Sequence, residues 1–402
     1  MIEREDYYTK IDPFIEKPII KVISGIRRSG KSTFMKMLMN RLINNGENNI
    51  IYLSKELIEF DFIKNHLDLH KYVSQKIQKN SRKNYLFIDE VQEIDKWEKT
   101  VNSLLAENIV DIYLTGSNSS MLSSEFATLL TGRYVVISMF PLSFKEFLKF
   151  RNIDNSTEFE KEFQLYLKYG GLPGIHNLPF DDEVIFQYIN AVYNTILLKD
   201  VVSRYQIRDV HLLEKITKFI FDNCGNITSA KKISDFLKSE QIKIGVQTVH
   251  NYISYLQNAF LIKKVNRYDI KGKKHLELFE KYYTNDTGIK HSVLKYKNDD
   301  ISGLLENVVY LELLRRGYVV SIGKINNFEV DFIAEKNTEK LYIQVSYLLA
   351  SKETEEREFR SLENIKDNYP KMVLTMDKIW GNERNGIIRK NIINFLLDGE
   401  YF

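Results

Sequence analysis

Residues 25–33, GIRRSGKST, combine the residue types that proteins use to bind a phosphate group. Two glycines enclose four residues and are followed by a lysine and two hydroxyl residues, in full agreement with the pattern G-x-x-x-x-G-K-[ST]. Glycine permits backbone angles that turn amide groups inward around an anion, and the start of a following helix attracts the same anion. We therefore expect a nucleotide site made by these residues: Gly25, Ile26, Arg27, Arg28, Ser29, Gly30, Lys31, Ser32 and Thr33.

Two residues of this loop have specific predicted roles. Lys31 is expected to reach the β- and γ-phosphates, and the Ser32 hydroxyl is expected to bind Mg²⁺. The alternative is a solvated glycine turn before an ordinary helix. The loop alone does not distinguish a kinase, a GTPase and an ATPase.

An acidic pair ends the apolar stretch YLFIDE at residues 85–90. Asp89 is expected to hold Mg²⁺ through water, and Glu90 suits a general base that polarises an attacking water. The guanine-binding pattern N-K-x-D is missing from the sequence, and a small-molecule kinase has less use for such a glutamate. The pair therefore favours hydrolysis by water, although two acids at a strand end can also be a solvated turn.

Polar residues after a further strand complete the predicted catalytic set. In YLTGSNSSML, Ser117 and Asn118 are expected near the γ-phosphate, where a polar side chain could orient the water. Arg133, in TGRYV, precedes the next strand and could act on the nucleotide of a neighbouring subunit. A surface ion pair is the alternative for Arg133, so the sequence leaves its role and the oligomeric state open.

The elements that must position these residues alternate between strands and helices. A helix is predicted over residues 29–46, and the strands that precede and follow it are predicted at 19–25, 49–54, 84–90, 110–117 and 134–139. This alternation predicts an α/β domain with a parallel sheet covered by helices, in which the first and fourth strands are neighbours. Four domains are expected: an ATPase core at 1–140, a helical lid at 141–205, a winged helix at 206–290 and a nuclease-like domain at 291–402.

These motifs resemble the AAA+ branch of the P-loop ATPases. The chain is most similar to prokaryotic ATP-binding proteins that join an AAA-like core to a C-terminal nuclease-like domain. The resemblance covers residues 15–175 and rests on GIRRSGKST, LFIDEVQEIDKWEKTV, YLTGSNSSML, LLTGRYVVISMFPLSFKEF and YGGLPGI. It implies ATP as the nucleotide, Lys31 and Ser32 on phosphates and Mg²⁺, Asp89 and Glu90 in hydrolysis, and Ser117 or Asn118 as the sensor. Arg133 is similar in place to an arginine finger.

The middle of the chain has the winged-helix pattern of three helices followed by a two-stranded hairpin. Polar residues on the outer face of the third helix and basic residues of the hairpin at 263–274 are candidates for contact with DNA. A protein-binding module is the alternative, and His250 is better explained as a partly buried helix residue than as a ligand. The candidate DNA contacts are Gln247, Thr248, Asn251, Lys263, Lys264, Arg267, Lys271, Lys273 and Lys274, with His250 and Ser254 on the same outer face.

The C-terminal region resembles the core of the PD-(D/E)XK nucleases. Glu306 lies on a predicted helix, and Glu329 and Asp331 lie on the strand after it. Where that pattern requires Glu-x-Lys on the next strand, this chain has Gln344 and Ser346. Because glutamine is a weak metal ligand and serine carries no charge, we expect the nuclease-like domain to be inactive.

Composition excludes several classes of protein. The 402 residues carry a formal net charge of only +3, so any surface for nucleic acid must be a local patch. The single cysteine, Cys224, rules out an internal disulfide and a thiolate metal cage. The N-terminus lacks the apolar core of a signal peptide and no apolar run is long enough for a membrane span, which indicates a cytoplasmic protein.

Three functions follow from these observations. The first is a Mg²⁺-dependent ATPase that moves a winged helix and an inactive nuclease-like module on DNA. The second is a nucleotide-gated switch in signalling or defence whose partner is another protein. The third is an ATP-dependent nuclease, against which Gln344 and Ser346 argue.

Overall fold

The computed structural model divides into two compact units, which are described separately. The first unit contains Met1–Phe140 and Asn258–Phe260, and the second contains Pro141–Gln257 and Leu261–Phe402. The structure describes residues 2–46, 49–78, 83–119, 128, 130, 132–296, 301–349, 351–378 and 383–398, apart from the side chains of 277 and 278.

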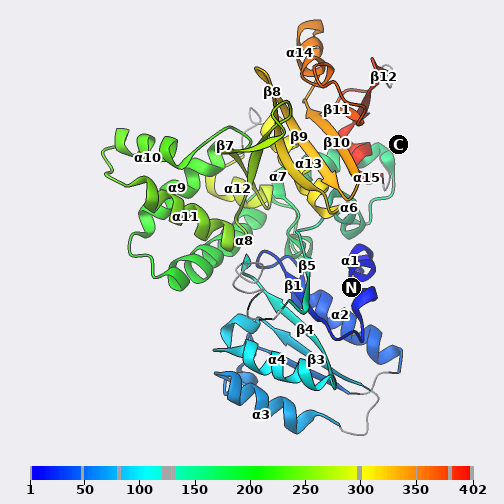
Figure 1. Cartoon of the computed structure of the whole chain (residues 1–402), viewed down its shortest axis with the longest axis vertical. Helices are drawn as coiled ribbons and strands as arrows, with labels where there is room; N and C mark the ends of the chain where they lie inside the picture. The colour runs from blue at the N-terminus through cyan, green and yellow to red at the C-terminus, as the bar shows by residue number, and fades with distance from the viewer. Residues whose placement is uncertain are drawn as a thin grey trace. The chain divides into compact units, whose positions relative to one another are not determined.

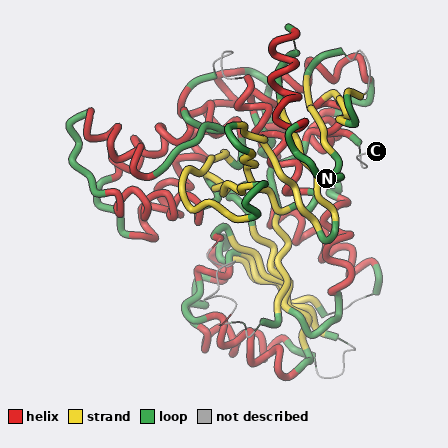
Figure 2. Tube along the Cα trace, turned by 45° about the horizontal axis from the view of Figure 1, so that its top comes forward, coloured by secondary structure: helices red, strands yellow, loops and turns green. Residues whose placement is uncertain are grey.

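The first unit is built on a five-stranded sheet with the strand order β2-β3-β4-β1-β5 (Figures 1 and 2). Every neighbouring pair is parallel, so the predicted parallel sheet is confirmed, and β4 lies beside β1 as expected. All strand carboxyl ends therefore meet at one edge. The strands are β1 (Ile20–Ser24), β2 (Ile50–Ser54), β3 (Asn84–Asp89), β4 (Val110–Gly116) and β5 (Tyr134–Ser138).

Helices cover both faces of this sheet. Phe34, Met35, Leu38 and Leu42 recur at helical spacing along α2 and enter a core shared with α1. A second core on the other face contains side chains from α3 and α4. The helical elements are α1 (Glu5–Ile11), η1 (Asp12–Phe14), α2 (Lys31–Asn44), η2 (Ile58–Phe60), α3 (His66–Lys76), η3 (Val91–Glu93) and α4 (Trp97–Glu107).

The second unit begins with helices, as the sequence predicts after residue 141. The segment YGGLPG at residues 169–174 interrupts these helices and is a site of close backbone contact, because a Cβ atom on Gly171 would lie 2.4 Å from the carbonyl oxygen of Leu142. Figure 1 shows α9, α10 and α11 in green as one helical group. The helical elements up to the hairpin are α6 (Phe144–Arg151), η5 (Ser156–Glu158), α7 (Phe159–Tyr169), η6 (Pro173–Asn177), α8 (Asp182–Thr195), η7 (Ile196–Ser203), α9 (Val210–Asp222), α10 (Ala230–Ser239) and α11 (Val246–Asn258).

An eight-stranded sheet with the order β12-β13-β11-β10-β9-β8-β6-β7 completes the second unit. The strands are β6 (Ile262–Asp269), β7 (Lys274–Thr284), β8 (Val319–Ile325), β9 (Phe328–Lys336), β10 (Glu339–Val345), β11 (Lys371–Thr375), β12 (Glu383–Arg384) and β13 (Ile387–Asn391). The helices among them are α12 (Thr287–Leu294), α13 (Ile301–Arg315), α14 (Lys352–Glu363) and α15 (Ile392–Leu397).

The predicted hairpin is part of this sheet. β6 pairs in parallel with β8, with Arg267 opposite Ile322 and Asp269 opposite Lys324. One sheet therefore contains strands from both sides of residue 290, the predicted boundary between the winged helix and the nuclease-like domain. Whether the two parts are separate domains stays a prediction. After β11 the structure adds β12, β13 and α15, which the sequence does not predict.

None of the helices within the described ranges combines the length and the apolar character needed to cross a bilayer.

Candidate functional site

The glycine loop connects β1 to α2 at the carboxyl edge of the first sheet. Gly25 lies against the residue that follows β5, because a Cβ atom at this position would come within 2.0 Å of the carbonyl oxygen of Met139. Gly30 precedes α2 with φ of 99°, a left-handed conformation that glycine adopts without strain. Side chains are therefore disfavoured at both glycines, and the chain can turn closely before the helix begins.

The lysine and serine of the loop both form hydrogen bonds, one within the loop and one to the end of β3. Lys31 is buried, and its Nζ donates hydrogen bonds to the carbonyl oxygens of Gly25 at 3.0 Å and Ile26 at 3.1 Å. Ser32 donates from Oγ to Oδ1 of Asp89 at 3.0 Å. The two predicted magnesium ligands, 57 residues apart in sequence, are thus in direct contact.

Asp89 ends β3 and is surrounded by hydroxyl groups. Besides Ser32, its carboxylate accepts hydrogen bonds from Ser54 Oγ at 3.2 Å and from Thr115 Oγ1. Thr115 also accepts a hydrogen bond from the backbone N–H of Glu90 at 3.0 Å. Sequence reasoning missed Ser54 and Thr115, although a threonine inside the fully buried apolar strand β4 is the kind of signal that could have revealed the second.

Glu90 has its carboxylate held by two neighbours. Its Oε2 accepts hydrogen bonds from Ser117 Oγ at 3.0 Å and from Gln92 Nε2. Burial raises the pKa of this carboxyl, but the charge of Lys31, the bond from Gln92, the charge of Arg27 and the bond from Ser117 together bring its pKa below the ordinary value. The lowered pKa favours the ionised form of Glu90, which is the form that can take a proton from water as a general base.

The remaining predicted residues of this site differ in exposure. Ile26, Arg27, Ser29, Ser117 and Asn118 are buried. Arg28 and Thr33 are exposed, and Arg28 has φ of 66°. The structure thus brings Lys31, Ser32, Asp89, Glu90 and Ser117 together, with Asn118 next to them in the chain.

Arg133 lies at the opposite edge of the same sheet. It immediately precedes Tyr134, which pairs with Ile20 at the start of β1, whereas the loop follows Ser24, which pairs with Ser138. Four residues of strand separate these edges by about 13 Å. Arg133 is exposed and cannot reach the loop of its own chain, so a role as a finger on the nucleotide of another copy stays a prediction.

The second candidate region is the outer face of α11. Gln247, His250, Asn251 and Ser254 recur at helical spacing, and all are exposed. Gln247 donates from Nε2 to Oδ1 of Asn251 at 3.1 Å. Thr248, also predicted to face outward, is half-buried.

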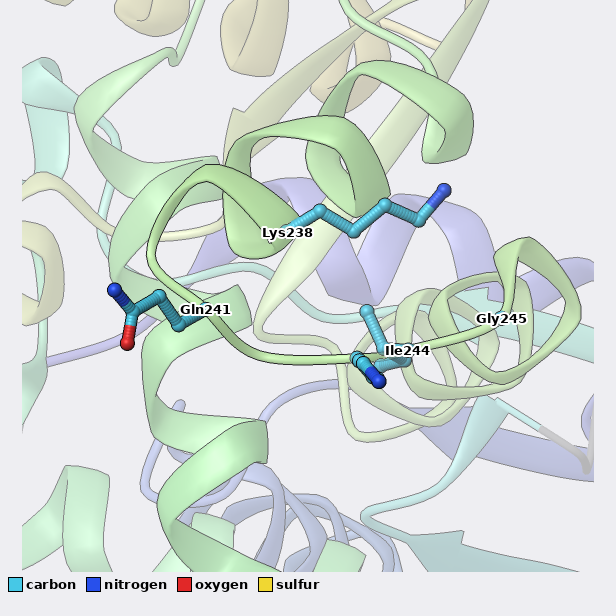
Figure 3. A pocket seen from close by; sticks show the side chains of 5 residues that line it. Lys238, Gln241, Ile244 and Gly245 are labelled. Atoms are coloured by element: carbon cyan, nitrogen blue, oxygen red, sulfur yellow. The ribbon is translucent and has the colours of Figure 1, made fainter.

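Two lysines lie at the end of α10 and in the turn that leads to α11. They line a shallow depression together with Gln241, Ile244 and Gly245, in which Lys238 and Gln241 extend to opposite sides of the turn (Figure 3). The lysines are Lys238 and Lys243.

The basic residues of the hairpin are in three different settings. Lys271, Lys273 and Lys274 at the tip are exposed. Lys264 forms an ion pair with Glu280. Burial lowers the pKa of Lys263 to about 8, and Arg267 is half-buried. The tip lysines are therefore the hairpin residues best placed to meet a phosphate backbone.

The acidic residues of the C-terminal region gather around a lysine that the sequence reading did not identify. Lys281 of β7 is buried, and its Nζ lies 2.8 Å from Glu329 Oε1, 3.2 Å from Glu306 Oε2 and 3.7 Å from Asp331 Oδ1. Burial favours neutral lysine, but the three carboxylates outweigh it and raise the pKa of Lys281. Burial is also the main reason why the pKa values of Asp331 and Glu306 are raised.

The residues that depart from the nuclease pattern have other partners. Gln344 donates from Nε2 to Glu358 Oε2 at 2.9 Å, and Ser346 donates its backbone N–H to the carbonyl oxygen of Leu374. Over the residues that the structure describes, no group of three or more His, Cys, Asp or Glu side chains is arranged to hold a metal ion.

Comparison with protein families assigns the first unit. Residues 17–148 match the AAA domain, a range that includes the glycine loop, the acidic pair and Arg133. With its parallel central sheet, this part of the chain has the fold of an AAA-type P-loop ATPase. Residues 160–300 match a domain of unknown function, DUF8612.

Two solved structures show more distant likeness. The Walker-type ATPase PABY2304 of Pyrococcus abyssi has a TM-score of 0.49 with 16% identity, over 73% of this chain and 96% of that one. The Aeropyrum pernix ORC1 protein, solved in complex with DNA, has a TM-score of 0.33 with 11% identity, over 73% of this chain and 92% of that one. At these low scores neither likeness establishes a shared function.

Two relatives match most of the chain. An uncharacterized protein of Haemophilus influenzae is 38% identical over 400 residues, which cover 99% of each chain. The uncharacterized protein MJ1544 of Methanocaldococcus jannaschii is 35% identical over 363 residues, which cover 87% of this chain and 79% of that one. The chain therefore belongs to the family of these two proteins, and its residues 17–148 match the AAA domain.

Proposed function

We propose that the chain is a Mg²⁺-dependent ATPase whose site is the carboxyl edge of the first sheet. The contact between Ser32 Oγ and Asp89 Oδ1 at 3.0 Å is the observation that carries the proposal. These are hard oxygen donors, which suit Mg²⁺, and Lys31 brings a positive charge to the same loop. Magnesium bound there would neutralise phosphate charge during hydrolysis.

The residues of the chain would divide the remaining work. The loop amides and Lys31 bind phosphate oxygens, and Ser32 and Asp89 hold the cation. Glu90 accepts a hydrogen bond from a water molecule and orients it, while Ser117 fixes the Glu90 carboxylate at 3.0 Å. Asn118 and Arg133 stay candidates for sensing the γ-phosphate, the second only from another copy of the chain.

Release of phosphate from ATP, with and without Mg²⁺, tests this function. Lys31→Ala should weaken ATP binding by about 100-fold, because the phosphate charge loses its compensating cation. Lys36→Ala is the matched control, since Lys36 is an exposed lysine on the same helix. Hydrolysis that persists without Mg²⁺, or survives in Lys31→Ala at low ATP concentration, would contradict the proposal.

We further propose that the ATPase acts on DNA through a winged helix formed by α9, α10, α11 and the β6–β7 hairpin. The polar face of α11 supports this role, because amide and hydroxyl groups can bond to base edges. Exposed lysines at the α10–α11 turn and the hairpin tip would contact phosphates. An isolated β-bridge between Thr228 and Glu280 adds a third chain segment beside the hairpin, as in a winged helix.

Fluorescence anisotropy with labelled single- and double-stranded DNA tests this second proposal. Binding should weaken as salt rises, and Lys273→Ala with Lys274→Ala should reduce the salt slope by about 2. Lys366→Ala, an exposed lysine elsewhere in the second unit, should leave the slope unchanged. Absence of binding at low salt, together with an ATPase rate that DNA does not change, would instead favour the nucleotide-gated protein switch.

A nuclease is the weakest of the three functions. Lys281 neutralises part of the acidic cluster from a strand outside the Glu-x-Lys pattern, and Gln344 is bonded to Glu358. Mg²⁺- or Mn²⁺-dependent nicking of DNA that disappears in Asp331→Ala would revive it.

A further inference from the structure

The segment that follows β2 leads directly away from the predicted magnesium site. Ser54, the last residue of β2, donates from Oγ to Asp89 Oδ2, and the next residue, Lys55, donates its backbone N–H to the Asp89 carbonyl oxygen at 3.1 Å. Lys55 Nζ then donates to the carbonyl oxygens of Phe60 and Ile63, both at 2.9 Å. The turn over residues 56–62, here called the β2 segment, is therefore fixed to the aspartate at one end and to a lysine at the other.

A second contact ties the β2 segment to the glycine loop. Arg27 Nη1 lies 3.6 Å from Glu56 Oε1. Arg27 is buried within the loop, and its charge also lowers the pKa of Glu90. One guanidinium group is thus shared between the nucleotide site and the β2 segment.

The outer side of the β2 segment is unusually apolar for an exposed turn. Ile58 is 92% exposed, Phe62 is 59% exposed and Leu57 is 43% exposed, while Phe60 between them is buried. Phe62 also lies against Tyr72 of α3, with ring centroids 6.0 Å apart. Apolar side chains concentrated in this way mark a surface that another molecule covers.

Acidic residues alternate with these apolar side chains. Glu56, Glu59 and Asp61 are all exposed within the same turn, and Asp61 is paired with Lys64 at 2.6 Å. The charge of the β2 segment itself is negative. A partner that buries Ile58 and Phe62 must therefore bring positive charge beside its own apolar groups.

We propose that the β2 segment is a nucleotide-controlled docking surface for a protein segment in which apolar residues alternate with lysine or arginine. The proposal rests on ATP binding at the glycine loop. A triphosphate in the loop competes with Glu56 for Arg27, because both are anions near one guanidinium group. Glu56 then loses its partner and adds its charge to the acidic rim, so that ATP tightens docking.

A labelled twelve-residue peptide of alternating leucine and lysine is the probe, and a leucine–glutamate peptide of the same length is its control. Fluorescence anisotropy with the full chain should show that the leucine–lysine peptide binds and that the leucine–glutamate peptide does not. A slowly hydrolysed ATP analogue should tighten this binding about 5-fold or more. Glu56→Gln should abolish the effect of the nucleotide. Ile58→Ser with Phe62→Ser should weaken peptide binding about 10-fold or more.

The matched control is Ile43→Ser, which removes a 51% exposed apolar side chain from α2 in the same unit. It should leave peptide affinity unchanged; an equal loss would mean that the peptide binds without a defined site. Titration with a fluorescent ATP analogue separates the two levels of the proposal. If ATP binds normally but neither peptide binds, or both bind equally, the docking surface is wrong while the ATPase proposal stands.

A second copy of the chain is the competing occupant. Light scattering that shows a dimer, lost in Ile58→Ser with Phe62→Ser, would overturn the proposal in favour of self-association. If ATP itself fails to bind, the nucleotide control fails with the proposed function. In that case the wild type could still bind the peptide, and Ile58→Ser with Phe62→Ser could still weaken this binding. The β2 segment would then be a docking surface that the nucleotide does not regulate.

Discussion

Two acidic clusters in this chain contain the same residue types and reach opposite electrostatic solutions. Asp89 is bonded to the hydroxyls of Ser32, Ser54 and Thr115. The C-terminal cluster of Glu306, Glu329 and Asp331 instead surrounds the ammonium group of Lys281. Hydroxyl groups satisfy a carboxylate without neutralising it, so Asp89 keeps a charge available for a cation, whereas Lys281 is itself the cation of the second cluster.

The contrast teaches that carboxylate spacing alone does not identify a metal site. Whether a carboxylate cluster can bind a metal ion depends also on the side chains that the tertiary structure places beside it. Lys281 reaches Asp331 across 50 residues of sequence, from a strand assigned to another predicted domain. The following predictions test whether one cluster is structural and the other is chemical.

The largest expected effect is on stability, from Lys281→Met. Removing the ammonium group leaves three carboxylates facing one another in a largely buried position. We expect the free energy of unfolding to fall by about 3–5 kcal/mol, the usual cost of breaking a buried ion pair on one side. Urea unfolding followed by circular dichroism measures it.

Lys238→Met is the control for that prediction. Lys238 pairs with Asp235 on the surface, where both side chains are about half exposed, so stability should hardly change. A small loss in Lys281→Met as well would mean that water already solvates the C-terminal cluster, and the contrast between the two clusters would disappear.

Glu90→Gln is the corresponding test of the first cluster. Turnover should fall about 100-fold, equivalent to about 2.7 kcal/mol in the barrier, because a neutral amide cannot orient water as a carboxylate does. ATP affinity should be retained, since Lys31 and Ser32 are unchanged. Single-turnover hydrolysis and nucleotide titration separate these quantities, and normal turnover would show that another residue is the base.

A smaller effect is expected from Thr115→Val. This substitution keeps the shape of the side chain but removes the hydroxyl that accepts from Glu90 N–H and donates to Asp89. The buried N–H is left unsatisfied, which should cost about 1–3 kcal/mol of stability. Turnover should also fall, because both acidic residues lose a positioning contact.

Thr217→Val provides a comparison for that substitution. Thr217 is equally buried, but its hydroxyl donates to the carbonyl oxygen of Leu213 within α9, far in sequence from the acidic pair. Stability should fall less than in Thr115→Val, and the ATPase rate should not change. Equal rates in both variants would contradict the role assigned to Thr115.

The position of Lys31 and Asp89 at one edge of the first sheet could be predicted because their surroundings obey local rules. The glycine pattern, the apolar strand before Asp89 and the helix after Lys31 can each be recognised in a short window, and parallel strands bring their carboxyl ends to one edge. Thr115 and Gln92 escaped notice because their roles depend on which side chains they face. Motif spacing indicated neither.

The C-terminal region could be predicted only as a succession of helices and strands. The pairing of β6 with β8 joins segments more than 50 residues apart, and no local pattern specifies it. For the same reason the Glu-x-Lys pattern points to position 346 and not to Lys281 of β7, which supplies the lysine in the folded chain. Arg133 differs from both clusters. Its position just before a strand was recognised from the sequence, but the strand register places it at the edge of the sheet opposite the glycine loop.

The smallest effect on stability is expected from Asp331→Asn, and the same substitution at Asp89 makes the comparison sharp. Burial and the neighbouring charge of Glu306 raise the pKa of Asp331, so a neutral side chain is tolerated there. Asn can still accept the hydrogen bond that Val345 N–H donates to Asp331 at 2.8 Å. We expect a change of at most about 1 kcal/mol at neutral pH and an unaltered ATPase rate. Asp89→Asn should instead lower the ATPase rate at least about 100-fold, since a neutral amide holds Mg²⁺ poorly.

The pH dependence of Asp331→Asn gives the sign of the effect independently. A carboxyl with a raised pKa in the folded chain binds more protons there than in the unfolded chain, so wild-type stability falls as pH rises above the ordinary aspartate pKa. The variant lacks this dependence. Its stability relative to the wild type should therefore increase from acid toward neutral pH in urea titrations. A difference that decreases with pH would mean that Lys281 outweighs burial at Asp331, and that the charged form of this aspartate stabilises the fold.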